Sequence, residues 1–177
     1  MKAILYDWGG ANTWLFHLLN GAHSSFSDRF MMLGTLLAGH ANFPVYLGIA
    51  CLFAIGSLSG EGSEKKAFMW LTTISVFCIA YMLDGQMLGL VKPWLDFPRP
   101  LLALPPATVH VFGRPEYHDS FPSGHASFAM LAIASLWPML PRQARAFGIF
   151  FVCWAGISRI CLGAHFPADV LAGFTSA

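Results

Sequence analysis

Charge is what this sequence has least of. Only 11% of its 177 residues are Asp, Glu, Lys or Arg, whereas a soluble domain normally carries about 25%. In contrast, 56% of the residues are hydrophobic, 15% are aromatic, and the mean hydropathy is positive. This deficit of charge predicts a protein whose main solvent is a membrane rather than water.

Net charge is also nearly absent, with a formal value of +1. Bulk electrostatics therefore favours neither nucleic acid nor an acidic protein as a partner, and we expect no nucleic-acid binding. Cysteine pairs with a disulfide or metal spacing are missing too, so we interpret the cysteines as small buried hydrophobic residues. They are Cys51, Cys78, Cys153 and Cys161.

Histidines without an interpretable partner spacing give no support for a metal site, and we expect neither a metal nor a cofactor. These histidines are His17, His23, His40 and His110.

Four apolar runs are long enough, or nearly so, to cross a bilayer as a helix, which takes about 20 residues. They cover residues 43–59, 67–91, 123–140 and 146–163. A fifth begins at Pro167 and is still apolar at Ala177. Because its residues would rise only about 16 Å against a hydrocarbon core of about 30 Å, we expect this span to be incomplete as given, as in a truncated chain. The sequence thus predicts an all-α, polytopic transmembrane helical bundle of about five to six spans.

Two shorter amphipathic stretches come first, "NTWLFHLLNG" and "DRFMMLGTLLAG". Their length suits interfacial or re-entrant helices. Alternatively, the second joins residues 43–59 in one long helix that is broken near Pro44. We expect a single integral-membrane domain over residues 1–177, with N-terminal helices in 1–42 and a transmembrane core in 43–177.

The connections between the runs differ in kind. "GEGSEKK" and "PRQAR" are short and basic, whereas residues 92–122 are rich in proline and contain charges and histidines. A loop of that length usually has a function or is disordered. Counting crossings places the long loop and His165 on one face and both basic turns on the other. The positive-inside rule makes the face with the basic turns cytoplasmic.

The first polar cluster is "KPWLDFPRP", with Lys92 at the end of a run and Arg99 in a proline-bounded loop. Two cations held by a stiff loop suit a phosphate, because Arg offers a planar fork and Lys a point charge. The alternative is a snorkelling lysine and an ordinary interfacial arginine.

The second cluster is "PSGH". Ser123 can cap the following helix, Gly124 lets a backbone N–H approach an anion, and the helix N-terminus adds partial positive charge. His125 would lie in the first turn beside that anion. The alternative is a capped helix with an interfacial histidine.

The third cluster is "SRICLGAHFPAD". His165 and Asp169 are four residues apart, and helical spacing would bring the carboxylate beside the imidazole. There it would fix the tautomer and favour the cationic ring. Arg159 lies on the same face of the membrane. The alternative is an interfacial ion pair, but three clusters on one face favour a shared site, since ionisable groups at a membrane are costly.

These clusters resemble the tripartite signature of the type 2 phosphatidic acid phosphatase superfamily. That signature has a Lys and an Arg-Pro, then Pro-Ser-Gly-His, then Ser-Arg followed by a His and an Asp. The chain matches all parts in order and spacing from Lys92 to Asp169. "NTWLFHLLNG" and "SDRFMM" are also similar to the amino-terminal region of small bacterial members, including undecaprenyl diphosphate phosphatases.

The resemblance implies a metal-independent phosphatase with an all-helical core. By position, His165 would be the nucleophile that becomes phosphorylated, and Asp169 would orient it. His125 would protonate the leaving oxygen and then assist water. The resemblance assigns the phosphate oxygens to Lys92, Arg99, Ser123, Gly124 and Arg159.

We therefore expect a lipid phosphatase in a bacterial inner membrane, with membrane lipids around it and its site facing the exterior. The expected substrate is a lipid phosphate or diphosphate, first undecaprenyl diphosphate. The alternatives are phosphatidylglycerophosphate, phosphatidate and lipid A phosphates, or transfer of the phosphoryl group to another lipid. A transporter or scaffold is a third class. Soluble vanadate-dependent haloperoxidases share the superfamily, but the apolar runs argue against them.

Some polar residues lie outside the clusters. Asp84 and Gln86 interrupt the second run, either to support Lys92 or, as we favour, to form hydrogen bonds between helices. We expect a solvated loop, rather than headgroup selection, from Arg114, Glu116, His118 and Asp119.

Overall fold

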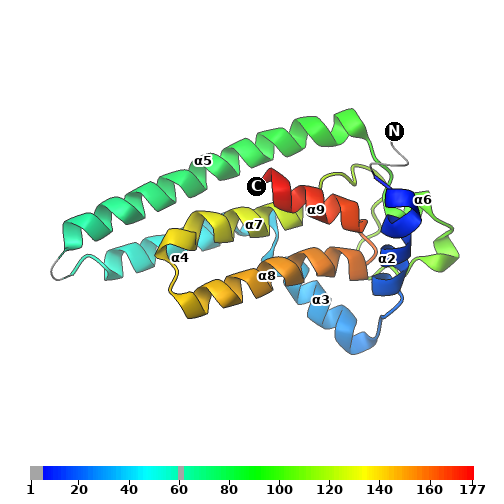
Figure 1. Cartoon of the computed structure of the whole chain (residues 1–177), viewed down its shortest axis with the longest axis horizontal. Helices are drawn as coiled ribbons and strands as arrows, with labels where there is room; N and C mark the ends of the chain where they lie inside the picture. The colour runs from blue at the N-terminus through cyan, green and yellow to red at the C-terminus, as the bar shows by residue number, and fades with distance from the viewer. Residues whose placement is uncertain (1–5, 60–61) are drawn as a thin grey trace.

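The computed structural model describes residues 6–59 and 62–177, and all regular structure in these ranges is helical (Figure 1). The all-α prediction is therefore confirmed. The α-helices are α2 (Ala11–Asn20), α3 (Ser25–Leu37), α4 (Phe43–Gly56), α5 (Ser63–Leu95), α6 (Pro100–Ala103), α7 (Gly124–Leu136), α8 (Arg142–Cys161) and α9 (Pro167–Ser176). Short 3-10 turns lie at Trp8–Gly10, His40–Asn42, Pro106–Thr108 and Trp137–Met139.

The helices form an elongated bundle, and α5, with 33 residues, runs along its length (Figure 1). Helix α7 is the centre, because it packs against α5, α8 and α9. Helix α3 packs on α8, α4 packs on α5, and α2 contacts α8 and α9. The short helices α2 and α6 and the loop between α6 and α7 gather at one end of the bundle. This end carries the polar clusters.

Two helical stretches of the described chain are long and apolar enough to cross a membrane, Ser63–Ala103 and Arg142–Cys161. Ser25–Leu37 and His40–Gly56 together make a third candidate, bent by 54° at their junction. This bend matches the alternative of one broken helix, although the break precedes Pro44. A proline in the first turn of α4 removes no helical hydrogen bond. The number of about five to six spans stays a prediction.

Glycines set the close approach of α9 to its neighbours. A Cβ on Gly156 of α8 would lie 2.6 Å from Val170 Cγ1. A Cβ on Gly173 of α9 would collide with the Ser123 carbonyl oxygen and lie 3.0 Å from Ala126 Cβ of α7. Small residues allow membrane helices to pack with their backbones close together. Here they bring α9 close to α8 and to the start of α7.

Large hydrophobic side chains cover the outer surface of the bundle. Leu52 of α4, Leu90 of α5 and Phe147 of α8 are 71%, 74% and 75% exposed. A soluble monomer rarely exposes apolar surface continuously. The bundle therefore has the surface of a membrane protein, while the three polar clusters of the sequence gather at one end.

Candidate active site

The three polar clusters of the sequence meet at the end of the bundle where α2 and α6 lie. Arg99 precedes α6, Arg159 lies in the last turn of α8, and His165 lies in the turn between α8 and α9. Arg99 Nη1 is 3.1 Å from His165 Nε2. The backbone N–H of Ser123 donates to the Asp169 carbonyl oxygen at 2.9 Å, which joins the second cluster to the third.

His165 is almost fully buried, at 1% exposure, and its tautomer follows from its neighbours. Since arginine can only donate, His165 Nε2 accepts from Arg99, and the ring proton lies on Nδ1. That nitrogen faces Asp169 Oδ2 at 3.4 Å. Burial, followed by the charge of Arg99, lowers the pKa of His165 well below its usual value. The ring is thus neutral, with a lone pair on Nε2.

This neutral ring corrects one expectation from the sequence. We expected Asp169 to favour the cationic form of His165, but burial and the neighbouring arginines outweigh the carboxylate. Asp169 instead holds the ring in one orientation.

Asp169 is fully buried and is held by three donors besides His165. Tyr6 donates to Oδ1 at 2.7 Å, while Ser120 Oγ and the Phe166 N–H donate to Oδ2 at 2.5 and 2.8 Å. Burial and the charge of Asp169 raise the pKa of Tyr6, so its hydroxyl remains a donor. Neither Tyr6 nor Ser120 was expected from the sequence, because neither lies within a cluster.

The pairing of His165 with Asp169 arises differently from the prediction. Helical spacing was expected, but α9 begins only at Pro167, so His165 lies before the helix. The carboxylate of Asp169 caps the N-terminus of α9 through the Phe166 N–H, and this cap turn carries it back to the imidazole.

Glu116 lies between the two arginines of the site. Its Oε2 is 2.5 Å from Arg99 Nη1 and 3.6 Å from Arg159 Nη2. Arg99 is further fixed by donating to the carbonyl oxygens of His118 and Ala164, at 2.7 and 3.1 Å. The carboxylate therefore lies between the two arginines to which the resemblance assigns the phosphate oxygens.

Glu116 was expected from the sequence to belong to a solvated loop, and its position between the two arginines corrects that expectation. The expectation fits His118 better, since its exposed ring pairs with Asp96 at 3.1 Å. Arg114 is exposed and lines the same cavity as Glu116.

The buried polar atoms without a hydrogen-bond partner within the described residues include Arg159 Nε and Ser123 Oγ. Ser123 is the N-cap residue of α7, but its side chain makes no capping bond, in contrast to the prediction. Buried polar groups without a partner are costly.

His125, in the first turn of α7, lines a cavity of about 190 Å³ together with Glu116, Arg159 and Ala164. Its ring makes no hydrogen bond to any residue in the described part of the chain. The ring is thus available to a bound ligand. The cavity also reaches Ala164, the residue next to His165 in the chain.

Lys92 and Gly124 complete the predicted set. Lys92 Nζ donates to the Asp119 carbonyl oxygen at 2.7 Å, and its charge acts on Arg99 and Asp169. Gly124 begins α7, where the helix N-terminus contributes partial positive charge.

Asp84 takes the structural role that we favoured. It accepts a short hydrogen bond from Ser127 Oγ and lies 3.3 Å from His40 Nε2, so it joins α5 to α7. His40 Nε2 in turn lies 3.1 Å from the Gly124 carbonyl oxygen. Gln86 is exposed.

The sequence profile of the PAP2 superfamily matches residues 70–177, which is more than half of the chain and includes all three clusters. The chain belongs to the PAP2 superfamily. The PAP2 signature thus accounts for the residues that the fold brings together.

Curated relatives of this PAP2 chain include the lipid A 1-phosphatases of Rhizobium etli and Rhizobium johnstonii. They are 42% identical over 154 and 156 residues, which is 80% of this chain in both cases. The matches cover 64% and 61% of the relatives, so the chain spans less than two thirds of their length.

Two solved structures share the PAP2 fold. The crystal structure of Aquifex aeolicus LpxE has a TM-score of 0.78 at 24% identity, covering 94% of this chain and 89% of that one. The first transmembrane PAP2-type phosphatidylglycerolphosphate phosphatase from Bacillus subtilis has a TM-score of 0.69 at 20% identity, covering 96% and 80%. At these identities the likeness concerns the fold alone.

Proposed function

We propose that this PAP2 chain is an integral-membrane lipid phosphatase that acts through a phosphohistidine. The observation that carries this proposal is the state of His165: a buried, neutral imidazole whose Nε2 lone pair lies 3.1 Å from an arginine that can bind phosphate. A nucleophile of this kind needs an orienting partner on its other nitrogen, and Asp169 is in place for that role.

The first half-reaction transfers the phosphoryl group to the protein. Substrate phosphate displaces Glu116 from the two arginines, and His165 Nε2 attacks phosphorus as the bond to the lipid oxygen breaks. Burial and the charge of Arg159 leave His125 neutral before substrate binds. The negative charge of the bound substrate favours its protonated form, and this form donates its proton to the leaving oxygen. Phosphoryl transfer depends mainly on positioning and charge stabilisation, which the cations and the start of α7 provide. The oxygens would be held by Lys92, Arg99, Arg159, Ser123 Oγ and the Gly124 N–H.

The second half-reaction restores the protein. His125, now neutral, accepts a proton from a water molecule that attacks phosphorus, the bond to Nε2 breaks, and free phosphate leaves. The positive charge at the phosphate comes from protein side chains, so we expect the reaction to proceed without a metal ion.

The names of the Rhizobium relatives support the 1-phosphate of lipid A as the substrate. Our expectation of undecaprenyl diphosphate has no comparable support, and lipid A, one of the alternatives named from the sequence, takes its place. We place the protein in a bacterial inner membrane, with the catalytic end of the bundle on the outer face, because both basic turns lie at the other end.

A substrate panel tests this proposal. The full chain in detergent is incubated with lipid A, undecaprenyl diphosphate, phosphatidylglycerophosphate or phosphatidate, without an acceptor lipid and with or without a chelator. We expect free phosphate to be released fastest from lipid A and to be unaffected by the chelator. Release that needs an acceptor lipid would indicate a phosphotransferase, and faster release from undecaprenyl diphosphate would overturn the substrate assignment.

Variants test the assigned roles in the same assay. His165→Ala should abolish turnover, and Arg99→Ala should raise the barrier by about 2.7–4 kcal/mol, as loss of one oxyanion donor does. His118→Ala is the matched control, because it removes an exposed histidine from the same loop region. Turnover that survives His165→Ala would exclude the proposed nucleophile.

A further inference from the structure

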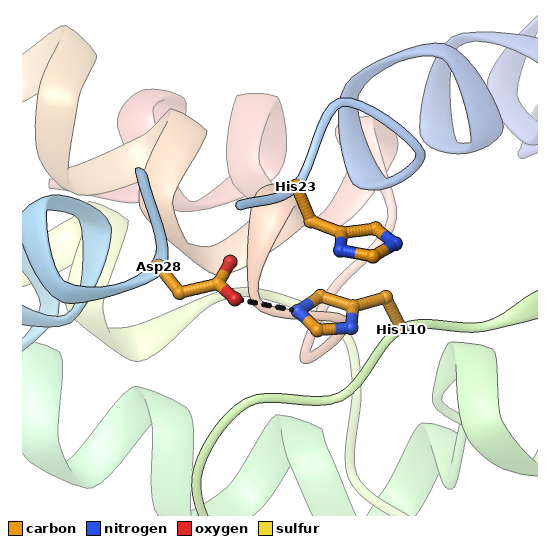
Figure 2. Close-up of side chains that lie close together, drawn as sticks. All are labelled: His23, Asp28 and His110. Atoms are coloured by element: carbon orange, nitrogen blue, oxygen red, sulfur yellow. Dashed lines mark hydrogen bonds and ion pairs between the residues drawn. The ribbon is translucent and has the colours of Figure 1, made fainter. Parts of the chain in front are cut away.

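A second group of ionisable side chains lies outside the catalytic cluster, where three segments of the chain meet. His23 comes from the connection between α2 and α3, Asp28 from the first turn of α3, and His110 from the loop between α6 and α7. Figure 2 shows the two imidazole rings one above the other, with the carboxylate facing their edges. One potential ligand atom of each residue lies within 4.8 Å of the others.

The contacts within this group are close. His110 Nε2 lies 3.0 Å from Asp28 Oδ2 (Figure 2). The rings of His23 and His110 are stacked, with centroids 3.9 Å apart and planes only 9° from parallel. An ion pair between one histidine and one carboxylate would be enough to anchor the loop. The second imidazole, that of His23, adds another nitrogen lone pair beside the pair, which an anchor alone does not need.

His110 is held on a rigid backbone. Asn20, which is 1% exposed, receives the His110 N–H at Oδ1 and donates from Nδ2 to the His110 carbonyl oxygen, at 2.8 and 2.7 Å. A Cβ on Gly163 would collide with that same carbonyl oxygen, and Gly163 has a φ of 77°. Glycine is therefore required for the turn after α8 to pack against this part of the loop.

Asp28 is equally well fixed, whereas His23 has room to turn. Asp28 as a whole is 6% exposed and follows a capping box formed by Ser24 and Ser27 at the start of α3. The ring of His23 lies at the surface. Asp28 and His110 can therefore bind a ligand with little movement, and the His23 ring can rotate to contact it as well.

Two imidazole nitrogens and one carboxylate oxygen are a donor set that suits Zn²⁺ and related ions. Around a tetrahedral ion with bonds of about 2.0–2.1 Å, the ligand atoms lie about 3.3 Å apart. His110 and Asp28 are already near that separation, and a tilt of the exposed His23 ring out of the stack brings the third donor in. Three protein ligands leave a fourth position for water.

We propose that His23, Asp28 and His110 form a binding site for a divalent first-row transition ion, with Zn²⁺ as the best match. The ion would tie the α2–α3 connection to the loop that carries Glu116 and Ser120 into the catalytic site. Its role is to hold this loop, so it takes no part in the phosphoryl transfer. The spacing of the histidines in the sequence gave no sign of it, because the ligands come from segments that are distant along the chain.

Zinc titration of the full chain in detergent, first stripped with a chelator, tests this site by isothermal calorimetry. We expect one Zn²⁺ per chain. His23→Ala should weaken binding by at least about tenfold, since even a residue that only supports a ligand contributes about 10–100-fold. His17→Ala is the matched control: it removes an exposed histidine from the neighbouring helix α2 and should leave binding unchanged.

Thermal unfolding of the same samples gives a second readout. Zn²⁺ should raise the midpoint of the wild type and of His17→Ala but not of His23→Ala or Asp28→Asn, because an ion that binds only the folded state stabilises it. Absence of zinc binding in the wild type, or equal binding in His23→Ala and Asp28→Asn, would overturn the proposal. Phosphate release is measured on the same samples, because it tests the proposed function independently of zinc binding. Absence of zinc binding together with intact phosphate release would overturn the metal site alone.

Discussion

At the scale of single residues, Glu116 is the negative partner of two arginines at the end of the bundle that carries the candidate site. Arg99 and Arg159 are both nearly buried, and buried cations are costly without a partner. Glu116 supplies that partner from the loop, although its own side chain is 40% exposed. Any phosphate that binds the two arginines must therefore compete with this carboxylate.

Glu116→Gln keeps the shape of the side chain and removes its charge. We expect inorganic phosphate and vanadate to inhibit up to about fivefold more tightly in this variant, because a partly exposed ion pair contributes about 0.2–1 kcal/mol. The measurement is the inhibition constant of each anion. Glu64→Gln is the control, because Glu64 is exposed in the first turn of α5, at the other end of that helix from Lys92. Its inhibition constants should equal those of the wild type. Equal or weaker inhibition in Glu116→Gln would show that the carboxylate does not compete.

The residues of the three clusters could be named from the sequence because fixed spacing marks them. Tyr6, Ser120 and Glu116 could not, since each reaches the site only through the fold. Tyr6 contacts Asp169 from 163 positions away in the chain. A hydroxyl or carboxylate at that distance carries no local pattern that would distinguish it from a surface residue.

At the scale of elements, the crossing of α8 and α9 positions the reactive pair. His165 lies in the turn between these helices, and Asp169 lies in the first turn of α9. Their separation thus depends on how closely α9 packs against α8 at Gly156.

Gly156→Ala tests this dependence. The added Cβ would lie 2.6 Å from Val170 Cγ1 and would collide with the ring of Phe174. Overpacking of this kind typically costs about 1–3 kcal/mol. We expect a lower midpoint of thermal unfolding and slower phosphate release, because α9 must move away and take Asp169 with it.

Gly48→Ala is the matched control for that substitution. Gly48 lies in α4, and a Cβ there would meet no atom within 4 Å. Alanine also has the higher helix propensity. If Gly156→Ala unfolded at the same temperature as Gly48→Ala, close packing at the crossing would not be what positions the pair.

The ends of the helices show what hydropathy could not predict. The predicted run 67–91 stops at charged residues, but α5 covers Ser63–Leu95, since helical hydrogen bonds continue through charged side chains. Conversely, the run 123–140 has no ionisable residue after His125, whereas α7 ends at Leu136 and passes into a 3-10 turn at Trp137–Met139. Pro138 has no backbone N–H, so it cannot continue the hydrogen bonds of the α-helix.

At the scale of the whole molecule, the apolar exterior makes the bundle dependent on lipid. Ile79 lies at the middle of α5 and is 58% exposed, while Phe68 lies near its start and is 71% exposed. Both side chains would be unusual on a soluble protein, but only the first would face the centre of a bilayer.

Lysine substitutions at these two positions test whether they lie at different depths in the membrane. Ile79→Lys should reduce the amount of folded protein in the membrane, because a lysine at the centre of a spanning helix costs about 2.5–3.5 kcal/mol. Phe68→Lys should be tolerated, since a lysine near a helix end can extend its charge into the headgroup region. The measurement is the yield of folded protein in the membrane fraction. Equal yields for both variants would show that α5 does not cross a bilayer.

The length of α5 has a consequence for how a lipid reaches the protein. A helix of 33 residues rises about 50 Å, whereas the hydrocarbon layer is about 30 Å thick. With α5 across the hydrocarbon layer, the end with Lys92 stands among the headgroups, at the height where the phosphorus of a lipid resides. Under the proposed function, the bond to the phosphate would be cut there while the acyl chains stay in their own leaflet, so no free energy would be spent on extracting the lipid.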